Sequence, residues 1–372
     1  MNLNRAIENT PHSAVAGYFG RAPEGAINLS LGEPLFQPPE SVRNAYIEAL
    51  SSGSSRYAPV QGLPELLEAV SSKLESENGI ASKPGNVLIT NGANEAIALA
   101  ILSVVDRGDE VLICEPSFPA FSPLVRYCMG KHVPLVLKEE NGFQPDLEEL
   151  KNLINRRTKL MVLNTPHNPT GSVFSRETLK AVSEICRCYI LVDEVYENLV
   201  YGKSHHSLAS VAEGPEKVIT VNSFSKTYCM CGYRLGYLHA SADLIRSFVK
   251  LKLYISICSS TPVQMAGLAA LQDKDFPAAA RAEFRNRRDI MQRGFRMLGM
   301  PFVKPDGTFY IFPNISEWGN DREVHEIFLK AGVLTLPGRI FHENCGSNIR
   351  FSFVANPGDI MEAIARIEGV IS

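Results

Sequence analysis

The sequence predicts an α/β protein with a large domain, built on a mainly parallel sheet covered by helices, and a smaller α+β domain. Its 372 residues exceed the size, about 250 to 300 residues, at which a single hydrophobic core stops growing. From about residue 87 onward, short β-branched runs alternate with helix-like stretches, as in βα units that feed a parallel sheet. The last third begins with a charged helical stretch, Ala279–Gly299, which we interpret as the link into the second domain.

The strands expected in the large domain are short and largely apolar, so both faces of their sheet should be covered by helices. Ser175 is the expected N-cap of a helix, because its hydroxyl can accept a bond from a free N–H of the first turn. In chain order the expected elements are strand Val87–Thr90, helix Asn94–Val105, strands Glu110–Cys114, His132–Leu137 and Leu160–Asn164, helix Arg176–Cys188, and strands Tyr189–Val192, Val218–Val221 and Leu235–His239.

The C-terminal part reads as a separate α+β arrangement. Strand-like Thr308–Phe312 follows the charged helix, and helices Arg322–Lys330 and Gly358–Glu368 flank strand-like Asn348–Phe353. We therefore predict a large domain over residues 38–275 and a small domain over residues 1–37 and 276–372.

Composition narrows the class of partner. Hydrophobic residues make up 45% of the chain and charged residues 21%, which is ordinary for a folded protein. The formal net charge of -3 provides no field that would gather phosphate backbones or anionic lipid. We therefore expect no nucleic acid and no membrane as partner, and favour a small molecule.

The cysteines and the N-terminal stretch predict a cytoplasmic protein without a metal. The first thirty residues contain no apolar secretory stretch. Of the eight cysteines, Cys186 with Cys188 and Cys229 with Cys231 form pairs, but each pair is separated by one residue, rather than the two to four that are usual at zinc sites. We expect reduced cysteines that pack as small hydrophobes.

The most informative stretch is Ser223-Phe224-Ser225-Lys226, directly after the apolar strand Val218–Val221. Lysine prefers solvent, so one placed among hydroxyls at the end of a buried strand must be ion-paired, covalently bonded or changed in its protonation. The ordinary alternative is a surface-loop lysine, and the neighbouring strand ends argue against it.

Three further strand ends carry polar groups of the kind that bind ligands in α/β sheets. Asp193 follows Tyr189–Val192, and its carboxylate is suited to hold a protonated ring nitrogen. The turn Asn164–Gly171, which contains Asn168, follows another strand, and Asn91-Gly92-Ala93-Asn94 opens a helix whose free N–H groups could bind a phosphate. An amine, a carboxylate, an amide and an anion site together suit pyridoxal 5'-phosphate, which forms a Schiff base with lysine and needs an acid at its pyridine nitrogen.

On these residues the sequence resembles the class I/II aminotransferases of PLP fold type I, the aspartate aminotransferase family, over nearly the whole chain. The landmarks occur in the order typical of the family: Ser30–Pro34, Tyr57, Gly62–Leu66, Thr90–Ala93, Glu115–Pro119, Asn168–Gly171, Asp193–Tyr196, Ser223–Lys226, Gly232–Gly236, Gly307–Tyr310 and Asn348–Ser352. The resemblance implies a ping-pong exchange of an amino group between an L-amino acid and a 2-keto acid.

The resemblance also implies roles at the cofactor ring. Lys226 would hold the cofactor as a Schiff base and shuttle the proton of the substrate Cα. Asp193 would pair with the pyridine nitrogen, and Tyr196 and Asn168 would hydrogen-bond the ring hydroxyl. Phe118 would stack on the ring, although a phenylalanine of the core is the plain alternative.

Further roles concern the phosphate and the substrate. Tyr57 would reach the phosphate of the neighbouring subunit, which implies a homodimer. Arg350 would bind the substrate α-carboxylate in a two-pronged fork, with Gly32 and Asn168 beside it, although a surface arginine is the ordinary alternative. The phosphate ligands implied within the chain are Gly92, Ala93, Asn94, Ser223, Ser225 and Arg234.

Two departures from the family pattern bear on the substrate. Aspartate-specific relatives bind the second carboxylate with an added cation, which would fall at Asn94 or within Tyr254–Ile257, and neither place carries one. A dicarboxylate without a partner charge would lose its hydration uncompensated. We therefore expect a neutral, aromatic or sulfur-containing substrate, unless Arg21 or Arg126 supplies the charge.

Two other functions remain open from the sequence. The same cofactor serves β-lyases, such as C–S lyases, and other chemistry at Cα, because the fold does not fix which bond breaks. A binding or regulatory protein could also retain the fold, although it would not need to keep Lys226, Asp193 and Arg350 together.

Overall fold

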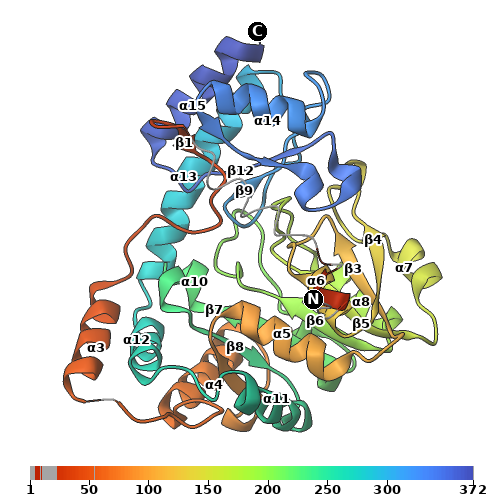
Figure 1. The fold of residues 1–372 in the computed structure, drawn as a ribbon. Coiled ribbons are helices and arrows are strands. Elements are labelled where there is room, and N and C mark those ends of the chain that lie inside the picture. The colour runs from red at the N-terminus through yellow and green to blue at the C-terminus, as the bar shows by residue number, and fades with distance from the viewer. Residues whose placement is uncertain (1–4, 9, 11–22, 54, 372) are drawn as a thin grey trace.

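The computed structural model describes residues 5–8, 10, 23–53 and 55–371. It shows an α/β fold with one seven-stranded sheet and, near the C-terminus, a two-stranded and a three-stranded sheet. Figure 1 shows the C-terminal elements, drawn in blue, grouped at one end of the molecule and the large sheet with its helices at the other. The fold expected from the sequence is confirmed.

The large sheet has the order β2-β8-β7-β6-β5-β3-β4, and only β8 runs antiparallel to its neighbours. Because β2 and β7 both pair antiparallel with β8, they point the same way, and the carboxyl ends of β2, β5, β6 and β7 meet at one edge. Every strand expected here is confirmed, within two residues at each end: β2 (Val87–Thr90), β3 (Glu110–Glu115), β4 (Lys131–Val136), β5 (Thr158–Asn164), β6 (Tyr189–Asp193), β7 (Val218–Ser223) and β8 (Gly236–His239).

Helices cover both faces of this sheet. As expected, Ser175 caps α8 by accepting a bond from the amide of Thr178. The expectation that this helix reaches Cys188 was wrong, because the chain leaves the helix at Cys186 and turns into β6. The helices of residues 5–275 are α1 (Arg5–Glu8), α3 (Glu40–Ser51), α4 (Pro64–Asn78), α5 (Ala93–Val104), α6 (Phe121–Tyr127), α7 (Leu147–Leu153), α8 (Arg176–Ile185), α9 (Leu208–Val211), α10 (Phe224–Thr227), α11 (Ala242–Ile255) and α12 (Thr261–Gln272).

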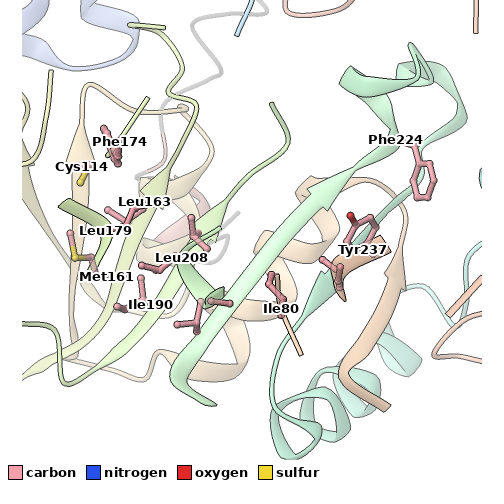
Figure 2. Packing of buried hydrophobic residues seen from close by; sticks show 14 of the residues in the cluster. Ile80, Cys114, Met161, Leu163, Phe174, Leu179, Ile190, Leu208, Phe224 and Tyr237 are labelled. Carbon is pink, nitrogen blue, oxygen red and sulfur yellow. The ribbon is translucent and has the colours of Figure 1, made fainter. Parts of the chain in front are cut away.

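Alternate strand residues pack on opposite faces of the sheet, as the two-residue period of a strand requires. On one face, Met161, Leu163 and Ile190 pack with Leu179 of α8 and Leu208 of α9, as Figure 2 shows. On the other face, Val162 and Leu191 belong to a second cluster with residues of α5 and α11. Each fully buried aliphatic side chain of this kind contributes roughly 1.5–3 kcal/mol.

A third cluster lies among the C-terminal elements and includes the ring pair Phe295–Phe351, whose centroids are 4.9 Å apart. Residues near the N-terminus join it, because β1 (Ile27–Asn28) pairs with β10 (Val333–Leu334). This pairing agrees with a small domain drawn from both ends of the chain, whose boundaries at residues 38 and 276 stay predictions. The other elements are α13 (Phe276–Met297), β9 (Tyr310–Ile311), α14 (Asp321–Lys330), β11 (Leu336–Pro337), β12 (Ile349–Ser352) and α15 (Pro357–Ile371).

Within the described part of the chain, no helix is both long and apolar enough to cross a membrane.

Candidate active site

A cavity of about 250 Å³ lies at the edge where the strand ends meet. Twelve of the fourteen residues that the sequence analysis assigned to a site line it; Gly92 and Tyr57 do not. The lining consists of Gly32, Ala93, Asn94, Ile97, Phe118, Pro119, Asn164, Asn168, Asp193, Val195, Tyr196, Ser223, Ser225, Lys226, Arg234, Tyr310, Phe341 and Arg350.

Lys226 enters the cavity from the short helix α10, which follows β7 directly. Ser223 caps this helix by accepting a bond from the amide of Ser225. The Lys226 ammonium donates a hydrogen bond to the carbonyl oxygen of Gly32 and lies 3.8 Å from the sulfur of Cys231. Among the described residues, the hydrogen-bond partners of the Lys226 side chain are this carbonyl and this thiol, and neither is a carboxylate.

Asp193 ends β6 at the floor of the cavity, and its side chain is buried. The backbone amide of Val195 donates to its carboxylate at 3.2 Å. Burial raises the pKa of Asp193 to about 7, although this hydrogen bond and the charge of Lys226 act in the opposite direction. A buried carboxylate with a raised pKa is one that lacks a close cation, and a protonated ring nitrogen would supply it.

The segment after Asp193 is fixed by buried polar contacts. Glu194 accepts bonds from the Ser207 hydroxyl at 2.6 Å and the Leu208 amide at 2.9 Å. Glu197 forms an ion pair with Lys73 of α4, and both side chains are 6% exposed. These contacts tie the loop that carries Tyr196 to α4 and α9. Glu194, Glu197 and His205 could together hold a metal ion, but the oxygens of both glutamates already accept hydrogen bonds.

Two tyrosine hydroxyls meet inside the cavity, those of Tyr196 and Tyr310, at 3.1 Å. Burial and the neighbouring Tyr310 raise the pKa of Tyr196 well above its usual value, so the Tyr196 hydroxyl keeps its proton and can donate a hydrogen bond. The Tyr310 hydroxyl also explains Gly32, because a Cβ at position 32 would lie 2.9 Å from it.

The start of α5 and the side chains of Ser223, Ser225 and Arg234 form a candidate anion site, which we call the phosphate cradle. Gly92 has φ of 81°, and a Cβ there would lie 2.5 Å from a guanidinium nitrogen of Arg234. Gly236 approaches the same turn from β8, since its Cβ would lie 2.9 Å from the backbone nitrogen of Ala93. Free N–H groups at a helix start, the hydroxyls of Ser223 and Ser225, and an exposed arginine together suit an anion such as phosphate.

Arg350 reaches the cavity from β12 and is buried. Its terminal nitrogens donate to the side-chain oxygen of Asn168 at 3.0 Å and to the carbonyl of Ser30 at 2.7 Å. The guanidinium carbon lies 4.1 Å and 4.9 Å from the ring centroids of Tyr310 and Phe341. The buried Nε has no hydrogen-bond partner among the described residues, which fits a group poised to receive an acid.

Asn164 connects two of the strand ends. Its side chain donates to the carbonyl of Asp193 at 2.9 Å and accepts from the amide of Asn168 at 2.8 Å. These bonds hold Asn168 beside Arg350. Phe118 also lines the cavity, and it packs edge-on against Phe121 with centroids 5.8 Å apart.

Six lining residues were not assigned to the site by the sequence analysis: Ile97, Pro119, Asn164, Val195, Tyr310 and Phe341. Tyr310 stood within a family landmark, yet nothing in the sequence indicated its contact with Tyr196. Phe341 lies in an irregular stretch far along the chain, and Ile97 reads as an ordinary core residue of α5. No local pattern could have found the last two.

The fold and this site define an aminotransferase of PLP fold type I, and comparisons with known proteins agree. The sequence profile of the family described as aminotransferase class I and II matches residues 24–367, so the chain belongs to that family. The probable aspartate aminotransferase of Methanocaldococcus jannaschii is 39% identical, with 99% of each chain covered. The aromatic-amino-acid aminotransferase 2 of Thermococcus litoralis is 35% identical, covering all of this chain and 98% of that one.

Among solved structures, the aspartate aminotransferase of Thermus thermophilus with maleate superposes with a TM-score of 0.94, at 32% identity and full coverage of both chains. The predicted aminotransferase activity is confirmed, and the β-lyase alternative is not favoured.

The buried carboxylate of Asp193 predicts a pH dependence in the ligand-free protein. Because its folded pKa of about 7 lies above the unfolded value of 3.8, the folded state binds more protons between these values and loses stability as the pH rises through this window. We expect Asp193→Asn to stabilise the protein at about pH 8 by up to about 4 kcal/mol, and the gain to shrink toward pH 4.

Urea unfolding at several pH values measures this difference. Asp275→Asn, at an exposed position, serves as the control and should show no comparable gain. A gain for Asp193→Asn that is the same at every pH would contradict the raised pKa.

Proposed function

We propose that the chain binds pyridoxal 5'-phosphate covalently through Lys226 and uses it to move an amino group between an L-amino acid and a 2-keto acid. The observation that carries the proposal is that one cavity contains both the Lys226 amine, which has no hydrogen bond to a carboxylate among the described residues, and the buried carboxylate of Asp193. When bound, the cofactor supplies an aldehyde for amines and a ring that accepts electrons from Cα.

The residues of the chain would divide the remaining work. Arg350 would bind the substrate α-carboxylate through its unpartnered edge and orient the Cα hydrogen toward the Lys226 amine, which takes the proton. Tyr196 and Asn168 would donate to the ring hydroxyl, and Phe118 would cover the ring face. Ser223, Ser225, Arg234 and the start of α5 would hold the phosphate.

Covalent attachment predicts a spectroscopic and a chemical signature. Mixed with pyridoxal 5'-phosphate, the protein should show an absorbance band near the visible edge, and borohydride reduction should add the cofactor mass to the peptide that contains Lys226. Lys226→Ala should lose both signals, because no amine remains at that place. Lys203→Ala, at an exposed position, should keep them. A cofactor adduct on any other lysine would refute the assignment.

We infer a neutral or aromatic amino donor. Phe118, Tyr310, Phe341 and Ile97 give the cavity an apolar lining. Besides Lys226, Arg234 and Arg350, which have other roles, no cation lines it within residues 23–53 and 55–371. Arg126 is exposed on α6 and absent from the lining, and Arg21 lies outside the described residues. The relatives described above include both an aspartate and an aromatic-amino-acid aminotransferase.

A half-reaction screen tests this substrate class. Each amino acid is mixed with the cofactor-loaded protein, and its conversion to the keto acid is followed by absorbance. We expect phenylalanine or methionine to react at least about tenfold more efficiently than aspartate, because the aspartate side chain would be buried without a counter-charge. Asn94→Lys should raise the efficiency with aspartate alone. If aspartate is the best donor of the unaltered protein, this inference fails.

We also propose a cytoplasmic homodimer in which Tyr57 completes the partner's site. Tyr57 is 81% exposed and lies apart from the cavity of its own chain. Apolar Ile47 and Leu50 of α3 and Met265 of α12 are exposed on neighbouring helices, which supports a subunit contact there. All eight cysteines are free, as is usual in the cytoplasm.

Complementation between two defective variants tests the shared site. Tyr57→Ala and Lys226→Ala should each be impaired as pure proteins. Unfolding them together and refolding the mixture should restore activity, since each mixed dimer has one site with an intact lysine and an intact partner tyrosine. If the co-refolded mixture is no more active than the two variants alone, Tyr57 belongs to the site of its own subunit or to neither site.

A further inference from the structure

We propose that Lys252 is a positioning residue for the phosphate end of the cofactor: its buried ammonium neutralises Glu95, so that the start of α5 remains an anion site. The inference rests on the proposed cofactor and extends the phosphate cradle to a residue on α11 that does not line the cavity.

Glu95 lies in the first turn of α5 and points back over the start of the helix. Its carboxylate accepts a hydrogen bond from the backbone amide of Asn91 at 2.5 Å and another from the Asn91 side chain at 3.3 Å. Asn91 directly precedes Gly92, which lies against Arg234. The carboxylate therefore stands at the same turn that would hold the phosphate.

Lys252 approaches this carboxylate from α11, and its side chain is fully buried. Its ammonium lies 2.8 Å from one oxygen of Glu95 and 3.1 Å from the Ser256 hydroxyl, which donates to the other oxygen. Burial would raise the pKa of Glu95, but the bonds from Lys252, Ser256 and Asn91 outweigh it and hold that pKa below its usual value. Glu95 is thus an anion.

An ionised carboxylate beside a phosphate site needs an explanation. The helix start attracts anions, so Glu95 would compete with a phosphate for its positive potential and repel it within a Debye length, about 10 Å. A buried ammonium in contact with Glu95 cancels that charge where water cannot screen it. Glu95 can then brace Asn91, and the turn that follows it, without weakening the cradle.

Arg234 cannot replace Lys252 in this role. Its side chain lies against Gly92 and donates to the carbonyl of Cys231, and no bond between Arg234 and Glu95 is found among the described residues. Arg234 is exposed, so it can turn its charge to a ligand, whereas Lys252 is fixed to Glu95.

The test compares two ligands that differ only in the phosphate, pyridoxal 5'-phosphate and pyridoxal, by titrating each into cofactor-free protein. We expect Lys252→Met to weaken the binding of the phosphorylated ligand by about tenfold and to leave that of pyridoxal nearly unchanged, because the uncovered charge acts on the phosphate. Glu95→Gln in the same protein should restore most of the loss. Lys250→Met, exposed on the same helix, is the matched control and should change neither.

A structural role alone would give a different result. If Lys252→Met only loosens the fold, its melting temperature falls and both ligands weaken together, which overturns the proposal. If Lys252→Met does not fold, the single variant Glu95→Gln provides the test. It should bind pyridoxal 5'-phosphate at least as well as the unaltered protein does. Weaker binding of pyridoxal 5'-phosphate with unchanged binding of pyridoxal would overturn the proposal. If the unaltered protein binds pyridoxal 5'-phosphate no more tightly than pyridoxal, the phosphate cradle itself is refuted, and this proposal fails with it.

Discussion

The parallel pairing of β5, β6 and β7 is the constraint on which the site depends. Asn164 pairs with Asp193 in register, and Asp193 pairs with Val221, two residues before the Ser223 cap of the lysine helix. The hydrogen bonds between these three strands therefore determine the relative positions of the Asn164 amide, the Asp193 carboxylate and the Lys226 amine. A shift of one residue in either pairing would turn the side chains of a whole strand to the opposite face, and the cavity would lose its floor.

The buried charged side chains fall into three groups, which differ in the partners that surround them. Glu197 and Glu95 each have a buried lysine, so they are stable anions that hold segments of the backbone. Arg350 has aromatic rings and neutral oxygens around it, and part of its edge is unsatisfied. Asp193 accepts a hydrogen bond from the backbone amide of Val195, but burial outweighs this bond and raises its pKa. The ion-paired carboxylates of Glu197 and Glu95 thus have a structural role. The side chains of Arg350 and Asp193 lack such partners among the described residues and face the cavity, where a ligand could supply the missing interactions.

The sequence predicted the large sheet well because its strands are short, apolar and separated by clear turns. It did not reveal α3, α4, α11 and α12, nor the two-residue strands β1, β10 and β11, which are too short to show a pattern. Lys226, Asp193 and Arg350 could be named because each is a polar group directly after or within an apolar run. Phe341 and Lys252 could not, since an aromatic in a loop and a lysine in a helix are ordinary until their neighbours are known.

The sequence by itself determined the fold, the family and the chemical groups of the site, because strand patterns and the polar residues that follow them are local properties. Only the tertiary structure decided which of those groups touch. That Tyr310 meets Tyr196, that Asn168 holds Arg350 and that Lys252 covers Glu95 are contacts between residues 114, 182 and 157 positions apart. Such contacts depend on how helices and strands pack, and no local sequence pattern records that packing.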